Sequence, residues 1–140
     1  MISEQTISRQ LEHLLHRMKS SEPNLMLDGI GLDIESGRSI NQSAARFFLT
    51  ETEQDWLKQQ DAPASSRILL RLWTVKEAIF KADPDNTEKI LGDYVLEDPS
   101  LWAGTAHRRD GRLLRFHYTS IEVDEGFLSI AALARGERDA

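Results

Sequence analysis

Two acidic residues, Asp33 and Glu35, are the first candidates for chemistry. The alternating apolar residues Ile30, Leu32 and Ile34 predict a strand, so the two acids share its other face with Cα atoms about 7 Å apart. Two like charges at this spacing make each other harder to ionise, and either water or a hard cation such as Mg²⁺ relieves the repulsion. The pair therefore predicts either a solvated strand face or part of a magnesium site.

A second candidate group lies in the run of residues 73–82. On a helical wheel Glu77 lies opposite the apolar stripe of this segment, and Lys81 lies one turn further along the same side, while Lys76 projects sideways. The simplest interpretation is an exposed Glu–Lys pair that stabilises the helix slightly. Because Trp73 shares the side of Glu77, that side is also expected to pack against another part of the chain. A carboxylate beside lysines in such a setting suits metal-assisted phosphate chemistry.

The elements that position these residues follow from periodicity. Apolar spacing predicts an amphipathic helix over 4–20, and Thr50 with Glu53 forms a capping box that opens another helix. Asp61, Pro63 and Ser65 are expected to interrupt the chain before the next helix. We further predict a strand over 27–35, a short helix over 44–48, a long helix over 66–82, and strands around residues 114–118 and 127–134. This order predicts an α+β fold in which an antiparallel sheet packs against helices.

Composition limits the class of protein. The chain has 140 residues, 40% of them hydrophobic and 29% charged, which predicts one globular domain over 1–140. Within it we expect an N-terminal amphipathic segment over 1–24 and a core over 28–135. A net charge of −6 argues against binding to nucleic acid, and the absence of cysteine excludes thiolate metal sites and cysteine nucleophiles. No apolar run is long enough to span a membrane and no secretory signal is evident, so a cytoplasmic protein without a membrane partner is expected.

Three segments together resemble a known family. They are Gly-Ile-Gly-Leu-Asp-Ile-Glu at 29–35, Arg46-Phe47-Phe48 with Glu53, and Trp-Thr-Val-Lys-Glu-Ala at 73–78 with Lys81. In this order and at this separation they resemble the signatures of the 4′-phosphopantetheinyl transferase superfamily. The strand motif and the closing stretch from Tyr118 to Ala134 are similar to the C-terminal half of the surfactin-synthetase-activating type. The short length of the chain is similar to that of the holo-acyl-carrier-protein synthases.

The resemblance implies an enzyme that moves the 4′-phosphopantetheine arm of coenzyme A (CoA) to a serine of an acyl or peptidyl carrier protein and releases 3′,5′-ADP. Such reactions serve fatty acid, polyketide and nonribosomal peptide biosynthesis. By the same resemblance, Asp33, Glu35 and Glu77 are expected to bind Mg²⁺. Glu77 and Lys81 would be catalytic, and Lys76 and Lys81 would contact the phosphates of CoA. Carrier binding is assigned to Arg46, Phe47 and Phe48.

One part of the family pattern is missing. Two-halved members hold CoA partly through a Ser-x-Ser-His motif in their first half, and no such motif occurs here. An active chain is therefore expected to form a homo-oligomer, a dimer or trimer, or to bind a complementary half. The alternatives are a non-catalytic carrier-docking or assembly half of a split or megasynthase-embedded transferase, and a different Mg²⁺-dependent enzyme that hydrolyses a nucleotide.

Overall fold

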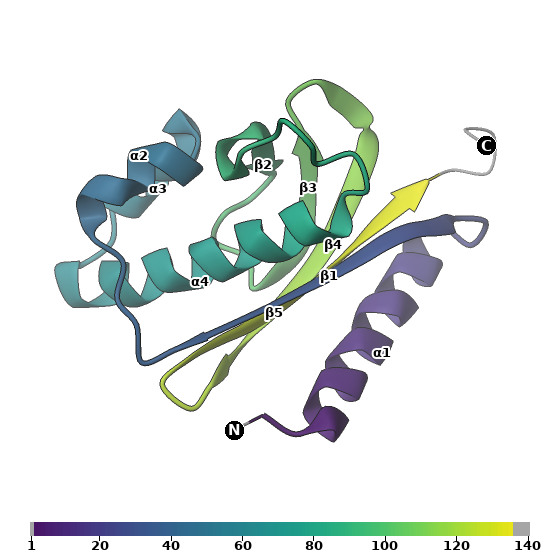
Figure 1. Cartoon of the computed structure of the whole chain (residues 1–140), viewed down its shortest axis with the longest axis horizontal. Helices are drawn as coiled ribbons and strands as arrows, with labels where there is room; N and C mark the ends of the chain where they lie inside the picture. The colour runs from purple at the N-terminus through teal and green to yellow at the C-terminus, as the bar shows by residue number, and fades with distance from the viewer. Residues whose placement is uncertain (1, 136–140) are drawn as a thin grey trace.

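The computed structural model of the chain describes residues 2–135, without the side chains of 112 and 113. Four α-helices, two short 3₁₀ helices and five strands are found in this part (Figure 1). In chain order they are α1 (Glu4–Ser21), β1 (Met26–Ser36), η1 (Gln42–Ala44), α2 (Ala45–Phe48), α3 (Glu51–Lys58), α4 (Ala62–Ala82), η2 (Leu91–Asp93), β2 (Tyr94–Leu96), β3 (Ala103–Arg108), β4 (Gly111–Val123) and β5 (Gly126–Arg135).

The five strands form one antiparallel sheet in the order β1-β5-β4-β3-β2, so that β1 and β2 are its edges. Helix α4 crosses one face of the sheet next to β1 and β5, and α2 and α3 lie together at the end of α4 where that helix begins (Figure 1). Helix α1 packs on β4 and β5 through Leu14 and Met18, which are fully buried against β5. The predicted α+β fold with a helix-covered antiparallel sheet is confirmed.

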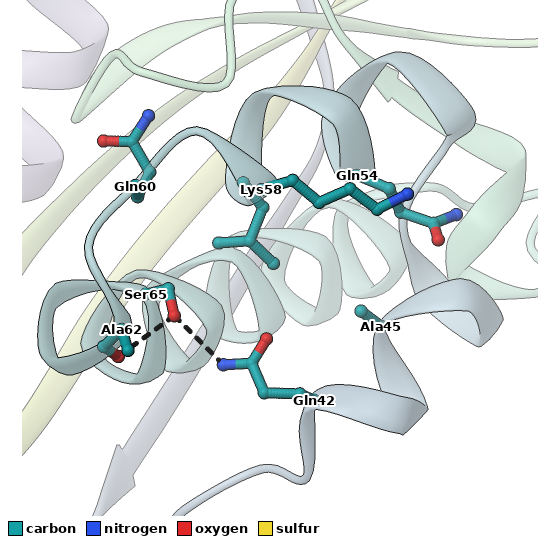
Figure 2. A pocket seen from close by; sticks show the side chains of 8 residues that line it. Gln42, Ala45, Gln54, Lys58, Gln60, Ala62 and Ser65 are labelled. Carbon is teal, nitrogen blue, oxygen red and sulfur yellow. Dashed lines mark hydrogen bonds between the residues drawn. The ribbon is translucent and has the colours of Figure 1, made fainter.

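Helix α4 begins earlier than the sequence predicted. The expected interruption is confirmed at Asp61, which lies between α3 and α4 as the N-cap residue, but it is wrong for Pro63 and Ser65, which already belong to α4. Figure 2 shows Ser65 on this helix, where it lines a pocket. Proline suits the first turn of a helix, since the first helical amide groups have no partner within the helix. The predicted apolar stripe is found, and Val75 and Ile79 are fully buried in the main core between α4 and the sheet. The capping box of Thr50 and Glu53 also opens α3 as predicted.

Two glycines allow β1 to lie directly on the backbone of α4. A Cβ atom added at Gly29 would lie 2.0 Å from the carbonyl oxygen of Ala82. A Cβ added at Gly31 would lie 2.1 Å from the carbonyl oxygen of Ala78 and 2.5 Å from the amide nitrogen of Ala82. Only glycine fits such an approach, and the next residue on the same strand face, Asp33, is thereby brought to the last turns of α4.

The two faces of β1 are used differently from a typical half-buried strand. Its face with Gly31 and Asp33 is turned toward α4 and buried, whereas the apolar Ile30 and Ile34 on the opposite face are 44% and 40% exposed. Leu32 on this apolar side packs against the cluster under α1, but α1 lies mainly on β4 and β5 and leaves Ile30 and Ile34 exposed. Among residues 2–135, no helix has the length and apolar character needed to cross a membrane.

Candidate active site

Asp33 and Lys81 join the two sequence motifs. Lys81 Nζ lies 3.0 Å from Oδ1 of Asp33 and also donates a hydrogen bond to the carbonyl oxygen of Leu32 at 3.2 Å. The other carboxylate oxygen, Oδ2 of Asp33, is buried and has no hydrogen-bond partner among the described residues. A buried carboxylate oxygen without a partner is costly, so this atom is a natural ligand for a cation.

Glu77 lies one helical turn before Lys81 and is partly buried. Burial raises the pKa of the Glu77 carboxyl, the negative charge of Asp33 raises it further, and Lys81 opposes the shift. Burial also raises the pKa of Asp33, against the hydrogen bond from Lys81. The three groups therefore form one electrostatic unit, in which two carboxyls ionise less readily than usual and the ammonium of Lys81 opposes both shifts.

Glu35 is held by a neighbour that the sequence analysis did not single out. Its Oε1 accepts a hydrogen bond from Arg38 at 3.3 Å, and the guanidinium of Arg38 also stacks over the ring of Trp73 at 5.2 Å. The spacing of Glu35 and Arg38, three residues apart after a strand, was the signal that could have predicted this pair. Within residues 2–135 no three carboxylate or imidazole side chains are close enough to form a ready-made metal cluster.

The residues nevertheless fit a hard divalent cation. Such ions prefer oxygen ligands and usually retain several waters, so a site needs only one or two carboxylates of the protein. The unpartnered Oδ2 of Asp33 meets this requirement. Glu77 is a second candidate ligand, because burial and the nearby charge of Asp33 raise its pKa. Glu35 could join them through Oε2, since its bond to Arg38 uses Oε1.

Lys76 lies in the core and not beside Asp33 and Lys81. The expectation that it contacts the phosphates of CoA is therefore wrong. The Lys76 side chain is fully buried, and Nζ lies 2.8 Å from Oε1 of Glu53 and donates a hydrogen bond to the carbonyl oxygen of Tyr94. Glu53 also accepts hydrogen bonds from the backbone amides of Thr50 and Leu96, both at 2.8 Å. Lys76 therefore connects α4 with α3 and β2, and its ammonium is not accessible to a ligand.

The three predicted carrier-binding residues separate into two groups. Phe47 is 66% exposed, and the guanidinium of Arg46 lies 4.9 Å from the centroid of its ring. Phe48 is only 2% exposed and packs edge-on against Trp73 at 5.1 Å between ring centroids. The assignment of Phe48 to a docking surface is therefore wrong, because a core side chain cannot contact a partner, whereas Arg46 and Phe47 remain available.

Comparison with known proteins gives a consistent result. A family model described as the 4′-phosphopantetheinyl transferase superfamily matches residues 29–128, which include Asp33, Glu77 and Lys81 but leave out α1. A search of curated protein sequences finds no match.

Two solved structures share the fold. One is the holo-[acyl-carrier-protein] synthase of Thermotoga maritima, with 18% sequence identity, a TM-score of 0.64, and coverage of 79% of this chain and 65% of that chain. The chain thus spans slightly less than two thirds of the length of this relative. The other is a holo-(acyl-carrier-protein) synthase of Bacillus anthracis in complex with CoA (3′,5′-ADP), with 17% identity, a TM-score of 0.62, and coverage of 79% and 99%. The match over residues 29–128 shows that the chain belongs to the 4′-phosphopantetheinyl transferase superfamily.

Proposed function

We propose that this protein transfers the 4′-phosphopantetheine arm of CoA to a serine of an acyl or peptidyl carrier protein, with Mg²⁺, and releases 3′,5′-ADP. The observation that carries the proposal is the Asp33–Lys81–Glu77 unit with its unpartnered carboxylate oxygen. The similar Bacillus anthracis protein holds CoA (3′,5′-ADP), which supports CoA as the co-substrate. CoA and carrier proteins are constituents of the cytoplasm, and we expect the protein to act there.

In the proposed reaction, Oγ of the carrier serine attacks the β-phosphorus of CoA. The new O–P bond forms as the bond to the bridging oxygen breaks, and 3′,5′-ADP leaves with that electron pair. Glu77 accepts the serine proton, for which its raised pKa is suitable. Lys81 stabilises negative charge on the departing phosphate. Asp33, Glu77 and Glu35 would hold Mg²⁺, which would supply positive charge to neutralise the pyrophosphate.

We also propose that a second copy of the chain completes the site. Strand β1, which carries Asp33, is an edge strand with exposed apolar side chains. An unpaired strand edge that exposes Met26, Ile30 and Ile34 favours association with another chain. Light scattering is expected to detect a dimer or trimer, and Ile30→Asp with Ile34→Asp is expected to dissociate it. A monomeric wild-type protein would contradict this part of the proposal.

The transfer itself is tested with purified protein, CoA, Mg²⁺ and a panel of apo carrier proteins. Intact mass spectrometry is expected to detect the phosphopantetheine increment on a carrier. Glu77→Ala should abolish labelling, whereas Glu12→Ala, a matched change on the exposed side of α1, should leave it unchanged. Carrier binding without labelling, and without binding of CoA, would instead support a docking or assembly module. Cleavage of CoA in the absence of a carrier would indicate a hydrolase.

A further inference from the structure

A buried pair of hydroxyl groups lies beside Asp33. Ser129 on β5 is the residue opposite Asp33 on β1. Opposite residues of an antiparallel pair have Cα atoms about 4.5–5.5 Å apart and side chains on the same face of the sheet. The hydroxyl oxygen of Ser129 lies 2.8 Å from that of Thr74 on α4, and both side chains are fully buried. Asp33, Ser129 and Thr74 therefore meet in the layer between the sheet and α4.

The hydrogen between the two hydroxyl groups belongs to Ser129. A serine or threonine hydroxyl has one hydrogen to donate and two lone pairs with which it accepts. The hydroxyl of Thr74 lies 2.7 Å from the backbone carbonyl oxygen of Arg71, which can only accept, so Thr74 donates its hydrogen there. Thr74 must then accept in its contact with Ser129. The only hydroxyl hydrogen of Ser129 is thus directed toward α4 and not toward β1.

The direction of this hydrogen affects the unpartnered oxygen of Asp33. Oδ1 of Asp33 accepts the hydrogen bond from Lys81, whereas Oδ2 has no partner among the described residues. The Cβ atoms of opposite residues are about 4.5–5.5 Å apart, so a serine hydroxyl reaches a carboxylate on the opposite residue by rotation about one bond. If Ser129 did not donate to Thr74, Oδ2 of Asp33 would be a buried, unpartnered acceptor on the neighbouring strand.

We propose that Thr74 is a positioning residue that keeps Oδ2 of Asp33 free for the cation. Thr74 accepts the hydrogen of Ser129, which would otherwise bond to Oδ2 and compete with Mg²⁺ for the same lone pairs. Hydrogen bonds to charged groups are stronger than those between neutral groups, so this competition would weaken the binding of the cation. The inference rests on the proposed function, because it requires that Asp33 binds Mg²⁺.

The position of Thr74 on α4 suits this role. Thr74 precedes Glu77 by three residues and Lys81 by seven, so the three side chains lie on one side of the helix. Thr74 is fully buried and touches neither solvent nor an accessible ligand, so it acts only through Ser129 and Asp33. Residues behind a metal ligand commonly change the affinity for the metal by about 10- to 100-fold.

The test removes the acceptor and measures the affinity for Mg²⁺. Thr74→Val keeps the size of the side chain, and the freed hydrogen of Ser129 should then bond to Oδ2 of Asp33. Calorimetric titration of the full chain with Mg²⁺ in the presence of CoA should show an affinity about 10-fold weaker than that of wild type. Thr74→Ala, which also lacks the acceptor, should weaken binding to a similar extent. Thr74→Ser, which retains it, should bind Mg²⁺ like wild type.

A double variant distinguishes this role from a loss of packing. Ser129→Ala removes the competing hydrogen, so Thr74→Val combined with Ser129→Ala should recover the wild-type Mg²⁺ affinity to within about 2-fold. If the hydroxyl pair were only structural, the double variant would bind Mg²⁺ no better than Thr74→Val. Thr119→Val is the control, because it makes the same change at a buried threonine opposite Ile130, on the side of the sheet that packs under α1. This variant should leave the affinity unchanged.

Transfer kinetics give a second readout. Thr74→Val should raise the Mg²⁺ concentration for half the maximal rate about 10-fold, whereas the rate at saturating Mg²⁺ should stay within about 2-fold of wild type. A lower saturated rate with unchanged half-saturation would overturn the inference, as would a double variant that fails to recover Mg²⁺ affinity. If wild-type protein binds Mg²⁺ and labels a carrier but Thr74→Val behaves identically, only this inference fails. If wild-type protein with CoA binds no Mg²⁺, the metal site of the proposed function fails together with it.

Discussion

Lys81 holds Oδ1 of Asp33 at 3.0 Å and leaves Oδ2 of the same buried carboxylate without a partner. The two residues are 48 positions apart and belong to β1 and α4, so this contact exists only because β1 lies on the backbone of the helix. A half-satisfied buried carboxylate destabilises the fold by itself. A buried oxygen in this state suits a positively charged ligand such as the proposed Mg²⁺.

Removal of the charge at Asp33 should therefore abolish transfer without unfolding the protein. Asp33→Asn keeps an oxygen that can accept the hydrogen bond from Lys81 but loses the negative charge, and we expect the transfer rate to fall at least about 100-fold. Calorimetric titration with Mg²⁺ in the presence of CoA should show weaker binding. Asp28→Asn, on the same strand and paired with Arg135, is the matched control and should retain activity. Equal activity of both variants would argue against Asp33 as a ligand.

The raised pKa of Glu77 predicts how stability depends on pH. The folded protein binds a proton on Glu77 at a higher pH than the unfolded chain does, so the free energy of unfolding falls as pH rises between the two pKa values. This loss of stability is complete above the pKa of Glu77 in the folded protein and absent below its pKa in the unfolded chain. Glu77→Gln should therefore raise the melting temperature at pH 8, and the gain should vanish toward pH 4.

Thermal unfolding from pH 4 to pH 8 measures this difference, with Glu12→Gln as an exposed control that should show no such trend. A gain that is independent of pH would mean that the effect of Glu77→Gln comes from packing rather than ionisation. In wild-type protein the transfer rate should rise with pH through the raised pKa of Glu77, because only the ionised carboxylate can accept the serine proton.

Lys76 and Glu53 should matter for stability rather than for binding of CoA. Lys76→Met leaves the Glu53 carboxylate buried without its charge partner, and we expect a loss of about 3–5 kcal/mol in the free energy of unfolding. The double variant with Glu53→Gln should recover part of this loss, because no uncompensated charge remains. Denaturant unfolding measures both, with the exposed Lys58→Met as the control. A stable Lys76→Met protein with weakened CoA binding would restore Lys76 to the ligand site.

Periodicity was sufficient to predict much of the fold. The apolar spacing of α1 and α4, the alternation in β1 and the Thr50–Glu53 capping box are local signals, and each corresponds to an observed element. The start of α4 was missed because Pro63 was interpreted as an interruption, although proline is favourable in a first turn. Local patterns also place Asp33, Glu77 and Lys81 on the correct sides of their elements.

Tertiary placement could not be predicted in this way. Phe47 and Phe48 are adjacent and chemically identical, and only tertiary packing, against Trp73 and the main core, determines that Phe48 is the buried one. Lys76 and Lys81 likewise lie on the same helix, but the direction of Lys76 depends on Glu53, which comes from another helix. Both errors arose at residues whose environment is set by contacts distant in sequence.

Gly31 provides a test of how closely β1 must approach α4. Gly31→Ala places a Cβ atom 2.1 Å from a backbone oxygen of Ala78, so strand and helix must separate, with an expected loss of about 3 kcal/mol or more. The separation would also lengthen the Asp33–Lys81 contact and reduce transfer activity. Gly92→Ala, whose nearest contact would be an ordinary 3.6 Å, should change stability by less than about 0.5 kcal/mol. Similar denaturation midpoints for both variants would contradict this interpretation of the glycine.

The exposed pair Arg46 and Phe47 predicts a selective effect on the carrier protein. A large aromatic side chain that is 66% exposed loses unfavourable contact with water when a partner covers it, and Phe47→Ala should raise KM for the carrier about 10-fold. Arg46→Glu should do the same against an acidic carrier, and added salt should weaken wild-type binding while affecting the variant less. Neither substitution should change KM for CoA, which separates docking from catalysis. Leu101→Ala, exposed elsewhere on the surface, is the control, and an equal rise in KM for both substrates would contradict a docking role.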